Sequence, residues 1–208
     1  MSPRSILESE VKFHLAEPGT VRERIRALGA GSRGRVFERN LCFDTADDTL
    51  KNSDRLLRLR RDDGVRLTYK APPEKANGEV KVYREIELEL GSFGAMAAIL
   101  SELGFREART YEKWRETFTL TRPHEALHLC LDEMPFGHFL EIEGPPEAIR
   151  PMAERLGLDW ATRILADYLA VFEAVCTALG RAGLDPTFEA CADLGPLPAT
   201  IWHELQAG

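Results

Sequence analysis

The sequence predicts an α+β protein built on eight largely antiparallel β-strands, with amphipathic helices on the apolar side of the sheet. In several short charged segments polar and apolar residues alternate, as in a strand, where residues two apart share a face. Short connections between these segments favour antiparallel pairing. Other stretches carry apolar residues at helical spacing. With 208 residues, 44% of them hydrophobic, the chain is long enough for one sizeable core.

The first strand is predicted around the stretch ESEVK. Glu8, Glu10 and Lys12 share one of its faces, and Val11 and Phe13 share the other. Seven further segments have strand composition or the same alternation. They are 37–44, 56–61, 65–70, 82–90, 113–120, 126–133 and 138–143.

Four amphipathic helices are predicted, and each needs an apolar surface to cover. Thr20 is the expected N-cap of the first, and Ser92 caps the second, which ends at Gly104. The Pro-Pro pair at 145–146 introduces the third. The longest apolar stripe, over 164–179, predicts the fourth.

Composition excludes several classes of protein. A net charge of -7 argues against nucleic acid as the main partner, because phosphate-backbone affinity usually needs a basic domain. No apolar run approaches the roughly 20 residues that span a bilayer, so no membrane partner is expected. The first residues lack the apolar core of about 7 to 15 residues found in a signal peptide, so a cytoplasmic location is expected. The four cysteines are too scattered for a disulfide framework or a zinc site.

The polar strand faces carry both signs of charge, mostly as pairs two residues apart. An isolated pair on a solvated face would contribute only about 0 to 1 kcal/mol. Six strands that each offer ionisable groups are hard to explain as surface decoration, and they would equally suit the interior of a closed barrel. The bases are Lys12, Arg58, Arg60, Lys70, Lys113 and Arg115; the acids are Glu8, Glu10, Glu85, Glu87, Asp132, Glu141 and Glu143.

If these groups share an interior, electrostatics indicates what joins them. Clustered carboxylates repel one another and partly protonate unless a cation lies among them, and Mg²⁺ or Mn²⁺ prefers such oxygen ligands. Arginine and lysine suit a polyanion, and guanidinium matches phosphate geometry. A triphosphate bound with two divalent cations would keep the site close to neutral, which predicts a triphosphate as the small-molecule partner.

These residues resemble the CYTH superfamily, which groups class IV adenylate cyclases with thiamine triphosphatases and inorganic triphosphatases, also called triphosphate tunnel metalloenzymes. The E-x-E-x-K signature stands at Glu8, Glu10 and Lys12. The resemblance covers roughly residues 5–175, and its later blocks are most similar to the bacterial cyclase-like branch. It continues through ERNLCFDT, LLRLR, LTYK, REIELEL, EKWRETF, LCLDEMPFGHFLEIEG and DYLAVF.

The resemblance implies an eight-stranded antiparallel β-barrel, or tunnel, with a charged interior and helix-covered outer faces. Phosphate would be bound by Lys12, Arg58, Arg60, Lys70, Lys113 and Arg115. Two Mg²⁺ or Mn²⁺ ions would be ligated by Glu8, Glu10, Asp132, Glu141 and Glu143, with Glu85 and Glu87 as further ligands or their supports. Glu8, Glu10 and Lys12 are the expected catalytic residues.

The expected activity is metal-dependent hydrolysis of a triphosphate, which demands the least of such a site. No Ser-His or Cys-His arrangement suggests a covalent intermediate, so direct in-line attack by water is expected. The substrate would be inorganic triphosphate, thiamine triphosphate or ATP. Two alternatives stay open: a class IV adenylate cyclase that makes cyclic AMP and pyrophosphate from ATP, and a non-catalytic module that binds polyphosphate or nucleotide.

The expected organisation is one tunnel domain over residues 1–180, followed by a C-terminal extension over 181–208. The extension, in which 201–205 suggests a short helix, either packs on the barrel or is partly flexible. The loop at 72–83 is either a lid for the tunnel or a plain hairpin excursion. The sequence leaves open whether the chain forms a homodimer.

Overall fold

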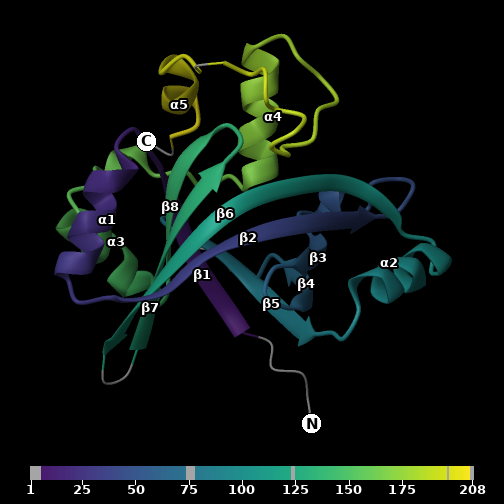
Figure 1. The fold of residues 1–208 in the computed structure, drawn as a ribbon, viewed down its shortest axis with the longest axis horizontal. Coiled ribbons are helices and arrows are strands. Elements are labelled where there is room, and N and C mark those ends of the chain that lie inside the picture. Colours follow the sequence, from purple (N-terminus) through teal and green to yellow (C-terminus); the bar gives the residue numbers. More distant parts are fainter. Residues whose placement is uncertain (1–5, 74–77, 123–124, 196, 207–208) are drawn as a thin grey trace.

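Eight antiparallel strands close into a barrel in the computed structural model (Figure 1). The structure describes residues 6–73, 78–122, 125–195 and 197–206. The order around the barrel is β1-β5-β4-β3-β2-β6-β7-β8, and β8 pairs back onto β1. The strands are β1 (Ile6–Leu15), β2 (Gly31–Asp44), β3 (Leu56–Arg61), β4 (Val65–Ala71), β5 (Lys81–Glu89), β6 (Arg106–Arg122), β7 (Glu125–Met134) and β8 (Gly137–Glu143).

All eight predicted strands are confirmed, but two of them, β2 and β6, are much longer than predicted. β2 begins at Gly31 and β6 at Arg106, and the two pair along nearly their whole length, from Gly31 opposite Thr119 to Asp44 opposite Arg106. Two bulges interrupt this pairing, one of them between Ser32 and Arg35. Bulges break strict alternation, so the period-two pattern does not mark the ends of these strands.

Within the described ranges, five α-helices accompany the barrel: α1 (Pro18–Ala27), α2 (Phe93–Glu102), α3 (Pro146–Arg155), α4 (Tyr168–Ala178) and the short α5 (Thr200–Glu204). Two 3₁₀ turns in the same ranges, η1 (Lys51–Ser53) and η2 (Trp160–Thr162), lie in connections. Ser92 caps α2 as predicted, since its side chain accepts a hydrogen bond from the Ala95 amide. Gly104 follows that helix with a positive φ of 89°, which glycine adopts without strain.

Two predicted helix starts are wrong. Thr20 lies inside α1, which has Glu17 at its N-cap and Pro18 in the first helical position, where the fixed φ of proline suits a helix start. The fourth helix begins at Tyr168 rather than at 164, because the Asp167 carboxylate caps it by accepting from the Ala170 amide. Ile164 is extended instead and pairs with Lys12 on the edge of β1.

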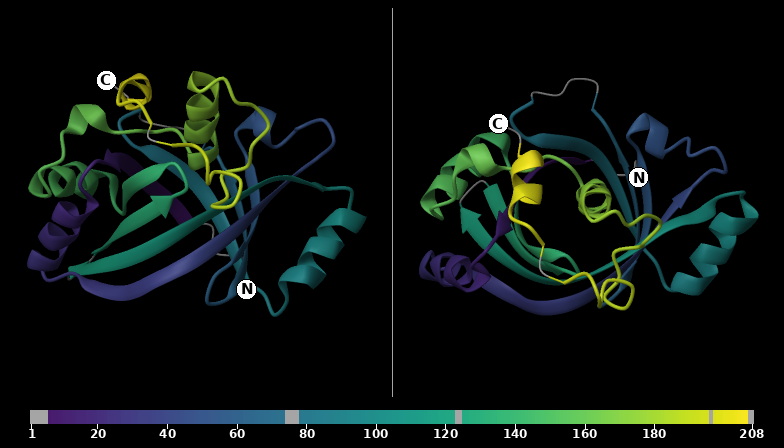
Figure 2. Two further views of the ribbon diagram at one scale, coloured as in Figure 1. Left: turned by 45° about the horizontal axis from the view of Figure 1, so that its top comes forward. Right: turned by 90° about the horizontal axis from the view of Figure 1, so that it is seen from above.

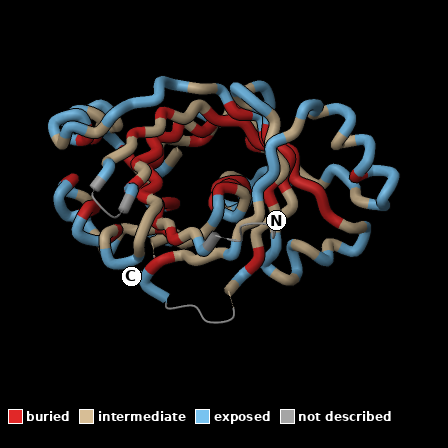
Figure 3. Tube along the Cα trace, turned by 90° about the horizontal axis from the view of Figure 1, so that it is seen from below, coloured by how far each residue is buried: buried red, intermediate tan, exposed pale blue. Residues whose placement is uncertain are grey.

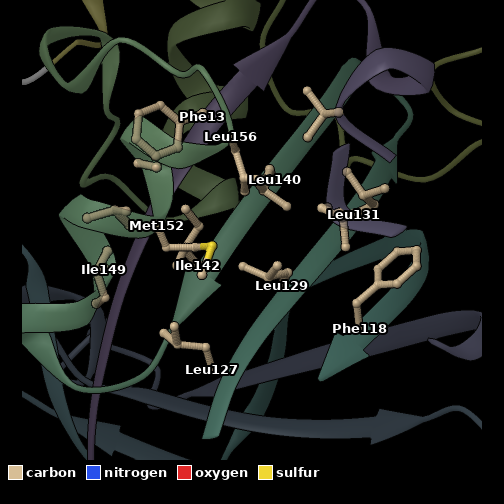
Figure 4. Packing of buried hydrophobic residues seen from close by; sticks show 14 of the residues in the cluster. Phe13, Phe118, Leu127, Leu129, Leu131, Leu140, Ile142, Ile149, Met152 and Leu156 are labelled. Atoms are coloured by element: carbon tan, nitrogen blue, oxygen red, sulfur yellow. The ribbon is translucent and has the colours of Figure 1, made fainter. Parts of the chain in front are cut away.

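Helices cover much of the apolar outer face of the barrel, as predicted, although Leu7 of β1 and Leu88 of β5 remain exposed. α1 and α3 pack on the side formed by β1, β6, β7 and β8, where Phe13, Leu129 and Ile142 meet Ile149 and Met152 (Figure 4). α2 contacts β3 and β6 through a separate cluster around Leu59 and Leu100. The main core therefore lies outside the barrel wall, and the inner face remains for polar groups.

One end of the barrel is covered by α4, α5 and the segments around them. Seen from above, α4 lies within the outline of the ring of strands (Figure 2). The view from below shows a helix within the same ring, whose strands are largely buried (Figure 3). From α5, Trp202 stacks on His14 with ring centroids 3.8 Å apart, so this part of the C-terminal segment packs on the barrel.

The expected lid at 72–83 lies partly outside the described residues, because 74–77 are not among them. The end of this loop belongs to β5, which begins at Lys81. Within the part of the chain that the structure describes, no helix is long and apolar enough to cross a membrane.

Candidate active site

The polar faces of the strands turn inward and line one cavity of about 920 Å³. Paired residues opposite each other in an antiparallel sheet share a face, so the register carries the alternation of each strand around the ring. The cavity lining includes twelve of the thirteen predicted site residues: Glu8, Glu10, Lys12, Arg58, Arg60, Lys70, Glu85, Glu87, Lys113, Arg115, Glu141 and Glu143. The predicted residue outside that lining is Asp132.

Three of the predicted metal ligands meet at one place. Glu10 of β1 lies opposite Glu143 of β8 in the register, and Glu8 follows two residues away on the same face. Each of the three offers a carboxylate oxygen within 4.8 Å of the others. Three hard oxygen donors so close together match the ligand chemistry of Mg²⁺ or Mn²⁺.

Two carboxylates of this cluster, Glu143 and Glu8, bind a proton more readily than an exposed glutamate does. Burial raises the pKa of Glu143 to about 8; Arg115 opposes this, and the charges of Glu8, Glu141 and Glu10 add to it. Burial also raises the pKa of Glu8, against the charge of Lys70. A cation at the cluster would replace these protons, because carboxylates bind metal in their ionised form.

The raised pKa of Glu143 predicts how stability depends on pH. The native carboxyl holds its proton up to about pH 8, whereas the unfolded one loses it near its ordinary value of 4.5. The stabilising contribution of the neutral carboxyl is therefore complete below about pH 4.5 and is lost as the pH rises through about 8. In EDTA, we expect the melting temperature to fall across this interval.

Added Mg²⁺ is expected to reverse that loss. The rise in melting temperature that Mg²⁺ produces should grow from pH 6 to pH 8 and level off above, because the ion no longer has to displace a proton. Thermal melts with EDTA or Mg²⁺ in matched buffers would measure both trends. Glu143→Gln should flatten them, and an equal Mg²⁺ effect at pH 6 and pH 9 would contradict the assignment.

Two further acids, Glu85 and Glu141, form ion pairs with lysines of the tunnel. Lys70 contacts the carboxylates of Glu8 and Glu85, and the latter lies 3.0 Å from its Nζ. Burial alone would raise the pKa of Glu85, but a hydrogen bond with Glu8 and the charge of Lys70 lower it. Lys12 lies 3.5 Å from Glu141 and donates to the Ala166 carbonyl at 2.8 Å.

Asp132 is the buried centre of a hydrogen-bond network behind the cavity wall. Its carboxylate accepts hydrogen bonds from Arg115 Nε and Nη2, both at 2.6 Å, from Lys113 Nζ at 3.0 Å and from Tyr168 Oη at 2.7 Å. Arg115 also contacts Glu141 and, at 3.5 Å, Glu143. The carboxylate side chain of Asp132 has no solvent exposure.

The structure adds three cavity-lining residues that the sequence did not single out, Tyr111, Tyr168 and Lys81, and one buried carboxylate that is not among the lining residues, Glu38. Glu38 is buried close to Arg60, Lys113 and Arg115, at 3.4 to 4.0 Å; burial opposes its ionisation, but these charges, Lys113 first, lower its pKa. Tyr111 accepts from Arg58 Nη1 at 3.1 Å. Tyr168 comes from α4, and Lys81 is the first residue of β5.

Two cations in the cavity are weakly neutralised. Within the described residues, no carboxylate oxygen lies within 4.0 Å of Arg58, and its buried Nε has no hydrogen-bond partner. Lys81 reaches one described carboxylate, that of Glu10, at 4.0 Å, and its Nζ lies 4.9 Å from the Tyr83 ring centroid. Burial and the charge of Lys12 lower the pKa of Lys81. Both side chains are therefore suited to binding an anionic ligand.

A closed barrel with a charged interior, a carboxylate cluster and inward-facing cations is the architecture of a triphosphate tunnel. The family model of the CYTH domain matches residues 7–155, and the chain belongs to this family. The curated protein "Putative adenylate cyclase MJ0240" of Methanocaldococcus jannaschii is 29% identical over 140 residues, which is 66% of this chain and 77% of that protein.

Solved structures share the fold. A structure from Vibrio parahaemolyticus, named a putative adenylate cyclase, superposes with a TM-score of 0.71 at 18% identity and covers 82% of this chain and 99% of that one. The PH1819 protein of Pyrococcus horikoshii gives 0.65 at 24%, with 80% and 98% covered. HpAC1 of Hippeastrum gives 0.59 at 21%, with 85% and 97% covered; it is named a putative adenylyl cyclase and is reported to have a dominant triphosphatase activity.

Proposed function

We propose that this protein is a metal-dependent triphosphatase in which water attacks the terminal phosphorus of an inorganic or organic triphosphate. The observation that carries the proposal is the cavity, which combines a three-carboxylate cluster with several inward-facing cations. CYTH enzymes are typically triphosphatases or class IV adenylate cyclases. The activity reported for the Hippeastrum protein favours hydrolysis.

Metal ions would be held chiefly by Glu8, Glu10 and Glu143, whose oxygens already meet. Bound there, Mg²⁺ or Mn²⁺ would supply positive charge and a more acidic water. Glu141 is the next candidate ligand, although Lys12 and Arg115 now neutralise it. Glu85 and Glu87 would support the ligands from β5, the former through its shared contact with Lys70.

The cations of the tunnel would hold the phosphates and stabilise the charge that develops on transfer. Lys12, Arg60, Lys70, Lys113 and Arg115 each have an acidic partner within 3.5 Å, so their charges are partly neutralised. Arg58 has none among the described residues and presents an unpartnered buried Nε. It is therefore the cation with the most to gain from a phosphate oxygen.

Lys81 extends this set beyond the family signature. Replacing it with methionine keeps the length of the side chain and removes a charge whose carboxylate partner lies 4.0 Å away. We expect Lys81→Met to weaken tripolyphosphate binding about tenfold, as the loss of one charged contact does. Calorimetric titration in EDTA would measure it. Arg150→Met, which removes a surface arginine paired with Glu154 outside the cavity lining, is the control and should change binding much less.

A class IV adenylate cyclase is the second candidate function, supported by the names of the relatives from M. jannaschii and V. parahaemolyticus. The same residues would serve it, with the ribose 3′-hydroxyl of ATP attacking the α-phosphorus. A non-catalytic polyphosphate-binding module is the third. It would have little use for the carboxylate cluster, which a metal-dependent enzyme needs.

One experiment separates these three functions. The purified protein is incubated with Mg²⁺ or Mn²⁺ at pH 7 and pH 9, with inorganic tripolyphosphate, thiamine triphosphate or ATP offered separately, and products are resolved by phosphorus NMR. EDTA-sensitive release of orthophosphate supports the triphosphatase and ranks its substrates. Cyclic AMP with pyrophosphate identifies the cyclase instead. Tight binding without any product overturns both enzymatic functions.

A further inference from the structure

The surroundings of Asp132 conflict with the metal-ligand role that the family resemblance implies for it. Its two carboxylate oxygens accept four hydrogen bonds, three of them from the charged groups of Lys113 and Arg115. The fourth comes from the Tyr168 hydroxyl. Three of these donors share Oδ2 and Arg115 Nε donates to Oδ1, so Oδ2 is fully occupied and both oxygens already accept from a positively charged group.

The cations around Asp132 and its position relative to the cavity also argue against a metal-ligand role. A divalent ion bound to Asp132 would lie beside the ammonium group of Lys113 and the guanidinium of Arg115, which are both buried. Asp132 is absent from the cavity lining, and it is not a member of the carboxylate cluster formed by Glu8, Glu10 and Glu143. A metal ligand must be reachable by the ion, and the Asp132 carboxylate, which has no solvent exposure and accepts three hydrogen bonds from charged groups, is not.

The fourth donor comes from outside the segment that the family model matches, which ends at residue 155. Ile164 pairs with Lys12, and three residues later Asp167 forms the N-cap of α4. The next residue is Tyr168, whose side chain points into the barrel. Two cations lie close to its ring, with centroid distances of 4.9 Å to Lys12 Nζ and 5.1 Å to Lys113 Nζ. Tyr168 therefore contacts two of the tunnel bases directly and a third, Arg115, through Asp132.

We propose that Asp132 and Tyr168 form a positioning pair, which holds Lys113 and Arg115 in the orientation that binds phosphate, and that Asp132 is not a metal ligand. The bidentate contact fixes the guanidinium plane of Arg115, and the shared Oδ2 fixes the Lys113 ammonium group beside it. This inference rests on the proposed function, since it assigns how the tunnel bases of that same site are held.

The first test locates the metal. Crystals of the wild-type protein soaked in Mn²⁺ would be analysed by anomalous difference maps. The expected result is ion density among Glu8, Glu10 and Glu143, with both Asp132 oxygens more than about 3 Å from any ion. A Mn²⁺ ion about 2.0 to 2.2 Å from an Asp132 oxygen, the range for a small divalent ion, would overturn the proposal.

The second test uses Tyr168→Phe, which removes one oxygen, keeps the ring and changes no charge at neutral pH. The Kd of tripolyphosphate, measured calorimetrically in EDTA, is expected to rise about fivefold, equivalent to one hydrogen bond. Tyr69→Phe is the matched control and should leave the Kd unchanged. Tyr69 lies on β4 outside the cavity lining, and its hydroxyl makes no hydrogen bond within the described residues.

A lower melting temperature for Tyr168→Phe with an unchanged Kd would show a structural role alone and would refute the positioning pair. Turnover at saturating Mn²⁺ gives a further distinction. The kcat should fall while the Mn²⁺ concentration for half-maximal rate stays the same, whereas a defect rescued by more Mn²⁺ would indicate a metal role. If the wild type shows no turnover, the proposed function fails, but the Mn²⁺ map and the tripolyphosphate Kd still test this inference.

Discussion

Glu143→Gln is expected to lower metal-dependent triphosphate turnover by at least about 100-fold, because even the outer partners of metal ligands contribute 10- to 100-fold. Glutamine keeps the shape of the side chain, but it removes the charge that Glu143 brings to the cluster with Glu8 and Glu10. Initial rates with inorganic tripolyphosphate over a range of Mg²⁺ concentrations would measure the loss. A wild-type rate would rule out the cluster as the metal site.

The same variant should bind tripolyphosphate more tightly in EDTA, but only at alkaline pH. Near pH 6.5 the wild-type carboxyl is largely protonated, since its pKa is about 8, so glutamine changes little. At pH 9 the wild type carries an extra negative charge that repels the ligand. Glu133→Gln is the matched control on β7, where that carboxylate pairs with Arg35 outside the cavity lining, and it should change neither rate nor binding.

Arg58→Met is expected to weaken tripolyphosphate binding by about 10- to 100-fold, since hydrogen bonds to charged groups are worth about 1.5 to 3 kcal/mol. Its guanidinium is buried and lacks a carboxylate partner within 4.0 Å among the described residues; it donates to Tyr111 and Thr68, which are neutral. Calorimetry in EDTA would measure the binding loss. Binding equal to that of the wild type would show that phosphate lies elsewhere in the tunnel.

The same substitution should change the stability of the fold little. Burial of the guanidinium is costly, but its hydrogen bonds to Tyr111 and Thr68 and the charges of Glu85 and Glu38 offset that cost. We expect the melting temperature without ligand to stay nearly the same, and the stabilisation by tripolyphosphate to be largely lost. Arg39→Met, which removes an arginine paired with Glu112 on the outer side of β2, should leave ligand stabilisation intact.

The strand pattern predicted the composition of the cavity well, because residues two apart leave a strand on the same side. Glu8, Glu10 and Lys12 were placed on one face by this rule, and all three line the cavity. Local patterns could not predict that the sheet closes into a barrel, because the pairing of β1 with β8 joins segments that are distant in the sequence. At that point the family resemblance, rather than periodicity, predicted the barrel.

Each residue that prediction missed has its own physical reason. On its face of the strand Glu38 is followed by the uncharged Asn40 and Cys42, so this face showed no pair of ionisable groups two residues apart. Lys81 lies one residue before the segment predicted as a strand. Tyr168 was read as part of an apolar helix stripe, and only the fold shows that its hydroxyl reaches Asp132. That contact crosses 36 positions of the chain, and no local spacing encodes it.

The ring of strands also sets a condition on how the chain folds. β1 emerges first during synthesis, yet one of its edges pairs with β8, so Glu10 meets Glu143 only after nearly the whole barrel has been made. Pairings between such distant segments slow folding, and a strand edge that is still unpaired favours association with other chains. The nascent protein thus carries an open strand edge for much of its synthesis, until β8 pairs with β1 and closes the barrel.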